Sequence, residues 1–311
     1  MAVLNIHLFG KFTVRSDTHI LNGFTACKVQ ELFSFLLLYR NRPHSREMLA
    51  GLLWGSSTTD KSKKYLRQAL WHLQTALDAG RDPDAYDARL RVEHDWVQID
   101  TNRWMWLDVA VLEEAFTLVE GVSGRDLDTE RAASLQAAVE LYRGDLLEGW
   151  YQDWCLYERE LLQNKYLMIL DKLMDYCLTH QEYDAGQRYG ALILRYDRAR
   201  EHTHQLLMHL QYLAGDRTGA LRQYERCVSA LREELGVQPD KFTQALYEEI
   251  RGAHEAKNYA PMDAVIAADP ATSLPEVLGR LKQLQAMLGR VQQRVKRDIR
   301  SVELGLKPFK H

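Results

Sequence analysis

The sequence contains little cysteine and no unbroken apolar stretch. Its 311 residues include four cysteines, and none of them forms a Cys-x-x-Cys pair. We therefore expect free thiols in a reducing compartment, without a disulfide framework. The chain has no run of about 18 apolar residues, which excludes the usual membrane-spanning helix. Residues 1–15 alternate apolar and polar positions, unlike a signal peptide, so we expect a cytoplasmic protein with no membrane partner.

The sequence signatures of common catalytic and cofactor sites are also missing. The chain has no Walker A motif, no Gly-x-Gly-x-x-Gly, no His-Glu-x-x-His and no Gly-x-Ser-x-Gly. His202, His204 and His209 lie close together in the sequence, but residues two apart on a helix face different sides. We therefore predict no enzymatic activity, no cofactor and no metal site.

Charge is distributed unevenly along the chain, whose formal net charge is −3. Residues 1–106 carry 14 Lys and Arg against 11 Asp and Glu, residues 107–255 carry 16 against 27, and residues 256–311 carry 10 against 5. A basic segment beside an acidic one favours an anionic partner for the basic segment. The positive excess in the first segment is small, so this interpretation depends on where its basic side chains lie.

Residues 1–106 combine short strand patterns with three helical ones. The predicted strands cover 3–9, 11–15 and 19–22, the predicted helices cover 27–40, 45–54 and 61–77, and a strand pair covers 90–100. Ser45 is the candidate N-cap of the second helix, which ends at Trp54. The strand pair turns at His94 and Asp95. This order of elements predicts a winged helix-turn-helix that is preceded by a small sheet.

Strand signals end near Leu107, and helical periodicity dominates to residue 255. The predicted helices cover 108–119, 129–142, 153–179, 182–196, 200–213, 217–235 and 240–255. Short turns join them in pairs, which favours a tetratricopeptide-like array. The predicted fold class is therefore mainly α with a small N-terminal β component. Aromatic residues of this region form its core or, as the alternative, line a groove for a ligand or peptide: Trp150, Trp154, Tyr157, Tyr166, Tyr189, Tyr196 and Tyr212.

The end of the chain has a different pattern. Residues 256–273 contain two prolines and several alanines, which predicts a linker. A heptad pattern of apolar residues covers 274–304, with apolar a positions at Leu274, Leu281, Leu288, Val295 and Val302. This pattern predicts a C-terminal helix that forms a homodimeric coiled coil or, as the alternative, docks on its own domain.

The helix predicted over 61–77 carries the main candidate binding residues. Opposite its leucine stripe, or at its start, lie Lys61, Lys63, Lys64, Arg67, Gln68, Trp71, His72 and Thr75. A helix fits the major groove of duplex DNA, where Arg and Gln pair with base edges, and lysines near a helix start suit phosphates. We predict phosphate contacts for the three lysines, and base contacts for Arg67, Gln68, Trp71 and His72. An ordinary solvated face is the alternative interpretation.

Two neighbouring segments supply the remaining candidates. In the strand pair, the predicted wing, Arg89, Arg91 and His94 are candidates for contact with phosphates or the minor groove. The turn also holds Glu93 and Asp95, which phosphate would repel, so contact through the wing is the weaker prediction. Ser45 and Arg46, at the start of the second helix, complete the predicted set of DNA-binding residues.

Several of these segments resemble a known family. The segment YLRQALWHLQTAL (65–77) is similar to the recognition helix of the Streptomyces antibiotic regulatory protein (SARP) family, which itself resembles the OmpR-type winged helix, and LAGLLWG (49–55) is similar to the family's second helix. The segments 141–162, 206–240 and 245–250 resemble the bacterial transcriptional activator domain. The resemblance covers about residues 1–255. It implies DNA binding near promoters, and activation by contact with RNA polymerase.

The chain departs from the family pattern in the predicted recognition helix. The family often has arginines where this chain has Trp71, His72, Gln74 and Thr75, which implies a different base preference or weaker attraction to phosphates. Trp71 contacts a thymine methyl group or a sugar, or packs against the wing. Two alternative functions stay open: a protein-binding scaffold that has lost DNA affinity, and a regulator whose helical domain binds a small molecule or a signalling nucleotide.

Overall fold

The computed structural model describes residues 3–16, 19–20, 24, 26–78, 89–101 and 104–258. The chain divides into two compact units, residues 1–251 and residues 252–311. The first unit contains the predicted winged helix and most of the helical array. The heptad segment and nearly all of the predicted linker lie outside the described residues. None of the described helices is long and apolar enough to cross a membrane.

A four-stranded sheet opens the chain. Its strands are β1 (Leu4–His7), β2 (Thr13–Ser16), β3 (His19–Ile20) and β7 (Met105–Leu107), in the order β3-β2-β1-β7. β1 pairs with β2 in antiparallel and with β7 in parallel orientation. The sequence analysis predicted the first three strands but not β7, because three residues are too few to show an alternation.

Three helices follow β3 in the chain: α1 (Cys27–Leu38), α2 (Arg46–Trp54) and α3 (Thr59–Asp78). Ser45 is the N-cap of α2 as predicted, since its Oγ accepts a hydrogen bond from the Met48 backbone N–H at 3.5 Å. α3 begins two residues before the predicted Lys61. The Ser62 backbone N–H donates to the Thr58 carbonyl at 2.9 Å, so Thr59 and Asp60 belong to the first turn of the helix.

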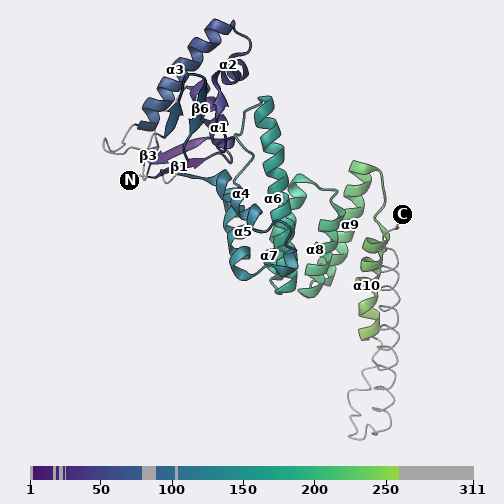
Figure 1. Ribbon diagram of the computed structural model, residues 1–311. Coiled ribbons are helices and arrows are strands. Elements are labelled where there is room, and N and C mark those ends of the chain that lie inside the picture. The colour runs from purple at the N-terminus through teal and green to yellow at the C-terminus, as the bar shows by residue number, and fades with distance from the viewer. Residues whose placement is uncertain are drawn as a thin grey trace, which may run out of the picture. The chain divides into compact units, whose positions relative to one another are not determined.

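A second, three-stranded sheet forms the wing. Its strands are β4 (His44–Ser45), β5 (Leu90–Val92) and β6 (Trp96–Ile99), in the order β4-β6-β5. β5 and β6 are the predicted strand pair. The short β4 was not among the predicted strands, and it pairs with the start of β6. This pairing joins the wing to the residues that lead into α2 (Figure 1).

The rest of the first unit is helical. Its helices are α4 (Asp108–Leu118), α5 (Thr129–Leu141), α6 (Asp153–Thr179), α7 (Tyr183–Tyr196), α8 (Glu201–Leu213), α9 (Arg217–Leu235) and α10 (Lys241–Asn258), with a short 3-10 helix at Gly124–Asp126. From α6 to α9, each helix packs against the next (Figure 1). The periodicity of the sequence predicted α6 and α9 with these bounds. α10 continues three residues into the predicted linker.

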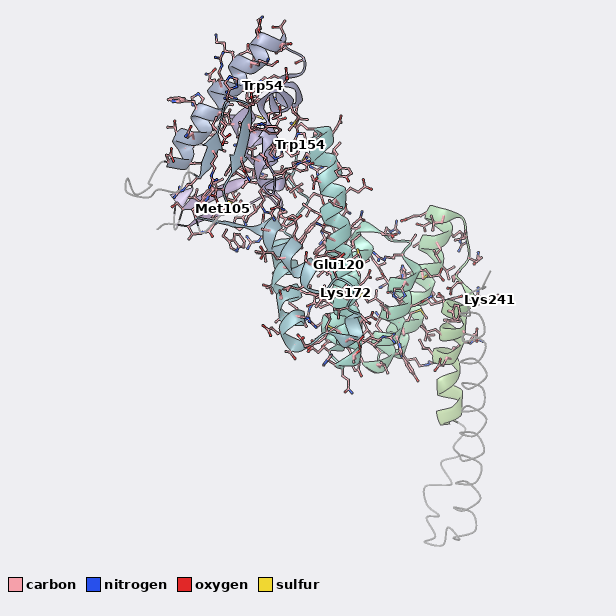
Figure 2. All side chains as sticks on the ribbon, in the orientation of Figure 1. Trp54, Met105, Glu120, Trp154, Lys172 and Lys241 are labelled. Atoms are coloured by element: carbon pink, nitrogen blue, oxygen red, sulfur yellow. The ribbon has the colours of Figure 1, made fainter. Side chains whose placement is uncertain are left out.

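Most of the aromatic residues singled out in this region belong to the core or border it. Trp154 and Tyr166 are buried, and Trp150 and Tyr189 are partly buried and pack against the same cluster. Trp154 lies at the start of α6 (Figure 2), and its ring is 5.5 Å from that of Phe35 in α1. Tyr157 is 66% exposed, so it is not a core residue.

The end of β1 is bonded to the helical region. The backbone N–H of Leu147 donates to the Leu8 carbonyl at 2.8 Å, and that of Gly10 donates to the Asp145 carbonyl at 2.8 Å. Gly10 has a φ of 80°, the left-handed conformation that favours glycine. The strand therefore continues into contacts with the segment between α5 and α6, which no local sequence pattern indicates.

Asp108, the first residue of α4, is a second connection. Its carboxylate accepts hydrogen bonds from the backbone N–H groups of Leu8 at 2.9 Å, Phe9 at 3.0 Å and Val109 at 2.7 Å. The residue is fully buried. Burial raises the pKa of Asp108 to about 6, against the lowering effect of these backbone donors.

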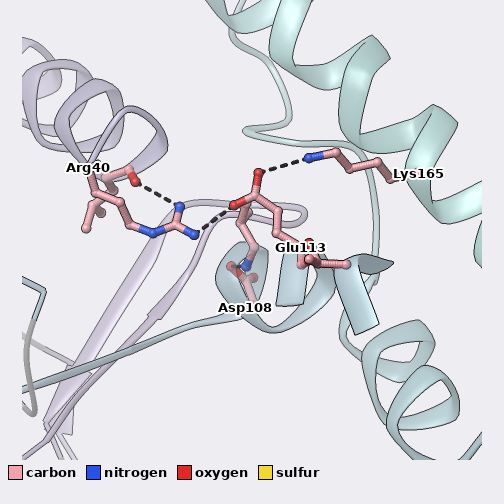
Figure 3. Close-up of polar contacts among 7 residues, drawn as sticks. Arg40, Asp108, Glu113 and Lys165 are labelled. Atoms are coloured by element: carbon pink, nitrogen blue, oxygen red, sulfur yellow. Dashed lines mark hydrogen bonds and ion pairs between the residues drawn. The ribbon is translucent and has the colours of Figure 1, made fainter. Parts of the chain in front are cut away.

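A charged triad forms a third connection to the helical array, this time from the end of α1 (Figure 3). Glu113 of α4 accepts from Arg40, which follows α1, at 2.7 Å and from Lys165 of α6 at 3.1 Å. Arg40 also donates to the Leu37 carbonyl at 3.3 Å. One carboxylate thus links three segments that lie far apart in the sequence.

Gly124 provides a test of the packing inside the helical array. A Cβ atom at this position would lie 2.6 Å from the Asp175 Cβ and collide with the Lys172 carbonyl oxygen. We expect Gly124→Ala to lower the free energy of unfolding by about 1–3 kcal/mol, the usual effect of overpacking. Gly51→Ala is the matched control, because nothing lies within 4 Å of its added Cβ. Thermal unfolding measures the difference. Equal melting temperatures of the two variants would contradict the expected clash at residue 124.

Candidate nucleic-acid interface

The apolar stripe of α3 faces the core. Its members are all buried: Ser62, Leu66, Ala69, Leu70, Leu73, Ala76 and Leu77. The Ser62 hydroxyl is accommodated there because it lies 3.0 Å from the Trp54 carbonyl oxygen, to which it donates. The stripe fixes the rotation of α3, and therefore which of its side chains reach solvent.

The eight candidate residues of α3 are all exposed: Lys61, Lys63, Lys64, Arg67, Gln68, Trp71, His72 and Thr75. At about 100° per residue, Lys64, Trp71 and Thr75 lie opposite the centre of the buried stripe. Arg67 and Gln68 lie on either side of that line. The structure therefore brings these residues together on one solvent-facing side of the helix.

Most of the polar groups on this face are available for a ligand. Within the described parts of the chain, Lys61, Lys64, Arg67 and Gln68 form no ion pair and no side-chain hydrogen bond. Lys63 is paired with Glu47 of α2, at 3.5 Å between Nζ and Oε1. Both side chains of that pair are more than half exposed. Such a pair contributes little free energy, so Lys63 can exchange the Glu47 carboxylate for another anion, such as a phosphate.

Trp71 is the most conspicuous apolar side chain of the face. It is 62% exposed, and its ring contacts His72 edge-on at a centroid distance of 4.9 Å. This exposed position agrees with a role in contact with DNA rather than with packing against the wing. The Thr75 hydroxyl donates to the Trp71 carbonyl at 2.8 Å, so its proton is engaged in the helix and its oxygen can still accept.

Two other candidate residues, at the start of α2, make contacts within the protein. Ser45 caps α2. Arg46 donates from Nη1 to the Glu93 carbonyl at 3.0 Å, and its backbone N–H donates to the Asp95 carbonyl at 2.9 Å. The guanidinium of Arg46 therefore holds the turn of the wing against the start of α2.

Arg89 plays a comparable part at the other end of α3. Its Nη1 donates to the Leu77 carbonyl at 2.5 Å, in the last turn of the helix. Its guanidinium also lies over the Trp104 ring, 5.2 Å from the centroid. A cation at the C-terminus of a helix satisfies free carbonyl groups and interacts favourably with the helix dipole.

Arg91 and His94 are the exposed cationic candidates of the wing. Arg91 is paired with Asp100 at 3.1 Å, and His94 Nδ1 lies 2.7 Å from a carboxylate oxygen of Asp95. The His94 side chain is 96% exposed. The neighbouring acids reduce the positive charge that the wing presents, which agrees with its lower rank among the candidate contacts.

A groove of about 820 Å³ separates α3 from the wing turn. Its lining comes from the start of α2, the first half of α3 and the turn: Ser45, Arg46, Glu47, Asp60, Lys63, Leu66, Arg67, His94 and Asp95. Cations and carboxylates are mixed in this lining. The groove alone therefore does not favour an anion as strongly as the outer face of α3 does.

The family model of the bacterial transcriptional activator domain matches residues 107–251. The transcriptional regulator RedD of Streptomyces coelicolor is 25% identical over 287 residues, which cover 89% of this chain and 74% of RedD. Residues 107–251 therefore have the sequence of a bacterial transcriptional activator domain. EmbR of Mycobacterium tuberculosis, solved in complex with a low-affinity phosphopeptide, has a similar fold, with a TM-score of 0.61 at 18% identity over 86% of this chain and 71% of EmbR.

In these comparisons the chain is similar to transcriptional regulators. The winged helix and the helical array predicted from the sequence agree with the fold that it shares with EmbR. The matched region begins at residue 107. The basic face of α3 therefore lies outside it, in the preceding part of the chain.

Proposed function

We propose that the protein is a transcription regulator that places α3 in the major groove of promoter DNA. The observation that carries the proposal is the outer face of α3, where cations and a glutamine have no partner among the described residues. In this arrangement Lys61, Lys63 and Lys64 bind phosphates near the helix start. Arg67 and Gln68 pair with base edges, while Trp71 and His72 contact bases or sugars beside them.

The wing and its anchors have separate roles in this proposal. Arg91 and His94 contact the backbone or the minor groove beside the α3 site. Ser45, Arg46 and Arg89 act as positioning residues, because their polar groups bond α2, the wing turn and the end of α3. Thr75 borders the base-reading residues and offers an acceptor oxygen.

We further propose that residues 1–106 form the DNA-binding domain and residues 107–255 the activator domain. The description of the matching family as a transcriptional activator domain supports activation. On the resemblance stated for the sequence, activation proceeds through contact with RNA polymerase. The heptads of 274–302 are the proposed device for pairing two copies on DNA.

The test is a genome-wide selection of sheared DNA by the purified regulator and by the Arg67→Ala/Gln68→Ala variant. We expect the wild type to enrich a shared promoter sequence and the variant to lose it, since each lost bidentate contact weakens discrimination by about 1–3 kcal/mol. The Arg232→Ala variant, an exposed position in α9, is the matched control and should select the same sequence as the wild type.

Two outcomes would count against the proposal. Equal enrichment by the wild type and the double variant would move the reading site to another surface. The absence of any enriched sequence would favour the interpretation of the chain as a protein-binding scaffold. Circular dichroism of the double variant excludes a folding defect as the cause, because both replaced side chains are exposed.

A further inference from the structure

A second groove lies within the helical array, away from α3. Its volume is about 450 Å³. Three consecutive helices and the turn after α7 line it: Gln187, Ala191, Leu194, Arg195, Arg198, His204, Leu207, Gln211, Gln223, Arg226 and Ala230. The spacing of these residues by three, four or seven places one face of each of α7, α8 and α9 on the groove.

The charge of this groove differs from that of its surroundings. Arg195, Arg198 and Arg226 line it, and the described lining includes no carboxylate. Residues 107–255 as a whole carry 27 Asp and Glu against 16 Lys and Arg. Three guanidinium groups on one concave surface of an acidic domain attract a compact anion.

A buried hydrogen-bond network holds one of these arginines. His204 Nε2 lies 2.9 Å from the Arg198 carbonyl, which can only accept, so this nitrogen carries the proton. Nδ1 then accepts from the Gln223 amide at 2.7 Å, and the amide oxygen of Gln223 accepts from Arg226 at 3.3 Å. His204 and Gln223 are both buried, so the network forms a preorganised floor beneath the Arg226 side chain.

The other polar groups of the groove are free or weakly engaged. Arg195 has no ion pair or side-chain hydrogen bond with any residue that the structure describes. Arg198 is paired with Glu233 and Glu234 at 3.5 and 3.7 Å, but its side chain is 63% exposed, so these pairs are weak. The buried Oε1 of Gln211 has no hydrogen-bond donor in the described structure.

We propose that this groove binds a small organic anion. Its carboxylate or phosphate group would lie between Arg195, Arg198 and Arg226, and a hydroxyl or amine of the same molecule would donate to Gln211. The apolar side chains of Leu194 and Leu207 would cover its carbon atoms. The volume lies in the range of small-molecule sites. The site is separate from the α3 face, so the proposal does not depend on how DNA is bound.

The test uses two probes, inorganic pyrophosphate and citrate, with the full-length protein at constant ionic strength. Isothermal titration and thermal unfolding measure binding, since a ligand that binds only the folded state raises the melting temperature. We expect at least one probe to bind, with a dissociation constant roughly tenfold or more higher in Arg195→Gln/Arg226→Gln. The Arg222→Gln variant, an exposed α9 position outside the groove, should bind like the wild type.

A steric variant makes the location testable without any change of charge. Ala191→Trp would fill the groove and should abolish binding while all three arginines remain. Tighter binding of pyrophosphate would indicate that the ligand carries a phosphate group. Tighter binding of citrate would indicate that it carries a carboxylate. The proposal is overturned if neither probe binds the wild type, or if the double variant and Ala191→Trp bind as well as Arg222→Gln does.

Discussion

Replacement of Asp108 with alanine is expected to lower the free energy of unfolding by about 3 kcal/mol or more. The change removes the acceptor of three buried backbone N–H groups, those of Leu8, Phe9 and Val109. Each buried donor without a partner costs about 1–3 kcal/mol. In a protein of this size, the loss corresponds to a melting temperature lower by roughly 6 °C or more, which thermal unfolding followed by circular dichroism measures.

Asp108→Asn separates the charge of this residue from its shape. The asparagine keeps one acceptor oxygen but turns an amide N–H₂ toward backbone donors, so we expect a loss of stability smaller than that of the alanine variant. Glu120→Ala, two residues after α4 and exposed, is the control and should change little. An alanine variant at position 108 as stable as the wild type would show that the contact between β1 and α4 contributes nothing to the fold.

DNA affinity is expected to fall about 10³-fold when salt is raised from 50 to 200 mM. This magnitude follows from about six phosphate contacts, each of which releases a counterion from the duplex. The three lysines at the start of α3 supply half of that number, and Arg91 of the wing is a further candidate for a phosphate contact. Fluorescence anisotropy with a labelled promoter fragment at several salt concentrations measures the slope.

The lysines account for about half of the expected slope. Lys61→Gln/Lys63→Gln/Lys64→Gln should therefore reduce the slope of log K against log salt by about 3, since each phosphate contact adds roughly 1. The triple variant should keep the base preference of the wild type. A slope that the three substitutions leave unchanged, or an affinity independent of salt, would contradict the assigned role of α3.

The helices of this chain could be predicted almost completely from the sequence. Apolar residues at three- and four-residue spacing placed α6 at 153–179 and α9 at 217–235, and the structure has these bounds. The missed elements, β4 and β7, have two and three residues. Strands so short are stabilised by pairing with partners far along the chain, and a local pattern does not contain that information.

The exposure of the candidate site could also be predicted, but its internal contacts could not. The apolar stripe of α3 determined which side chains reach solvent. Nothing in the sequence indicated that Arg46 bonds the wing turn or that Arg89 bonds the end of α3, because residues 47–49 apart and 12 apart meet only in the folded chain. The arginine groove was missed for the same reason, since periodicity gives the face of one helix and not which faces meet.

The contacts of Arg46 and Arg89 fix the distance between α3 and the wing before any DNA is bound. With α3 in the major groove as proposed, the duplex has to adapt its groove widths and curvature to that distance. The energy of this deformation depends on base-pair steps that no side chain touches. Selectivity should therefore extend to flanking positions, where flexible pyrimidine–purine steps are favoured although the protein makes no contact with their bases.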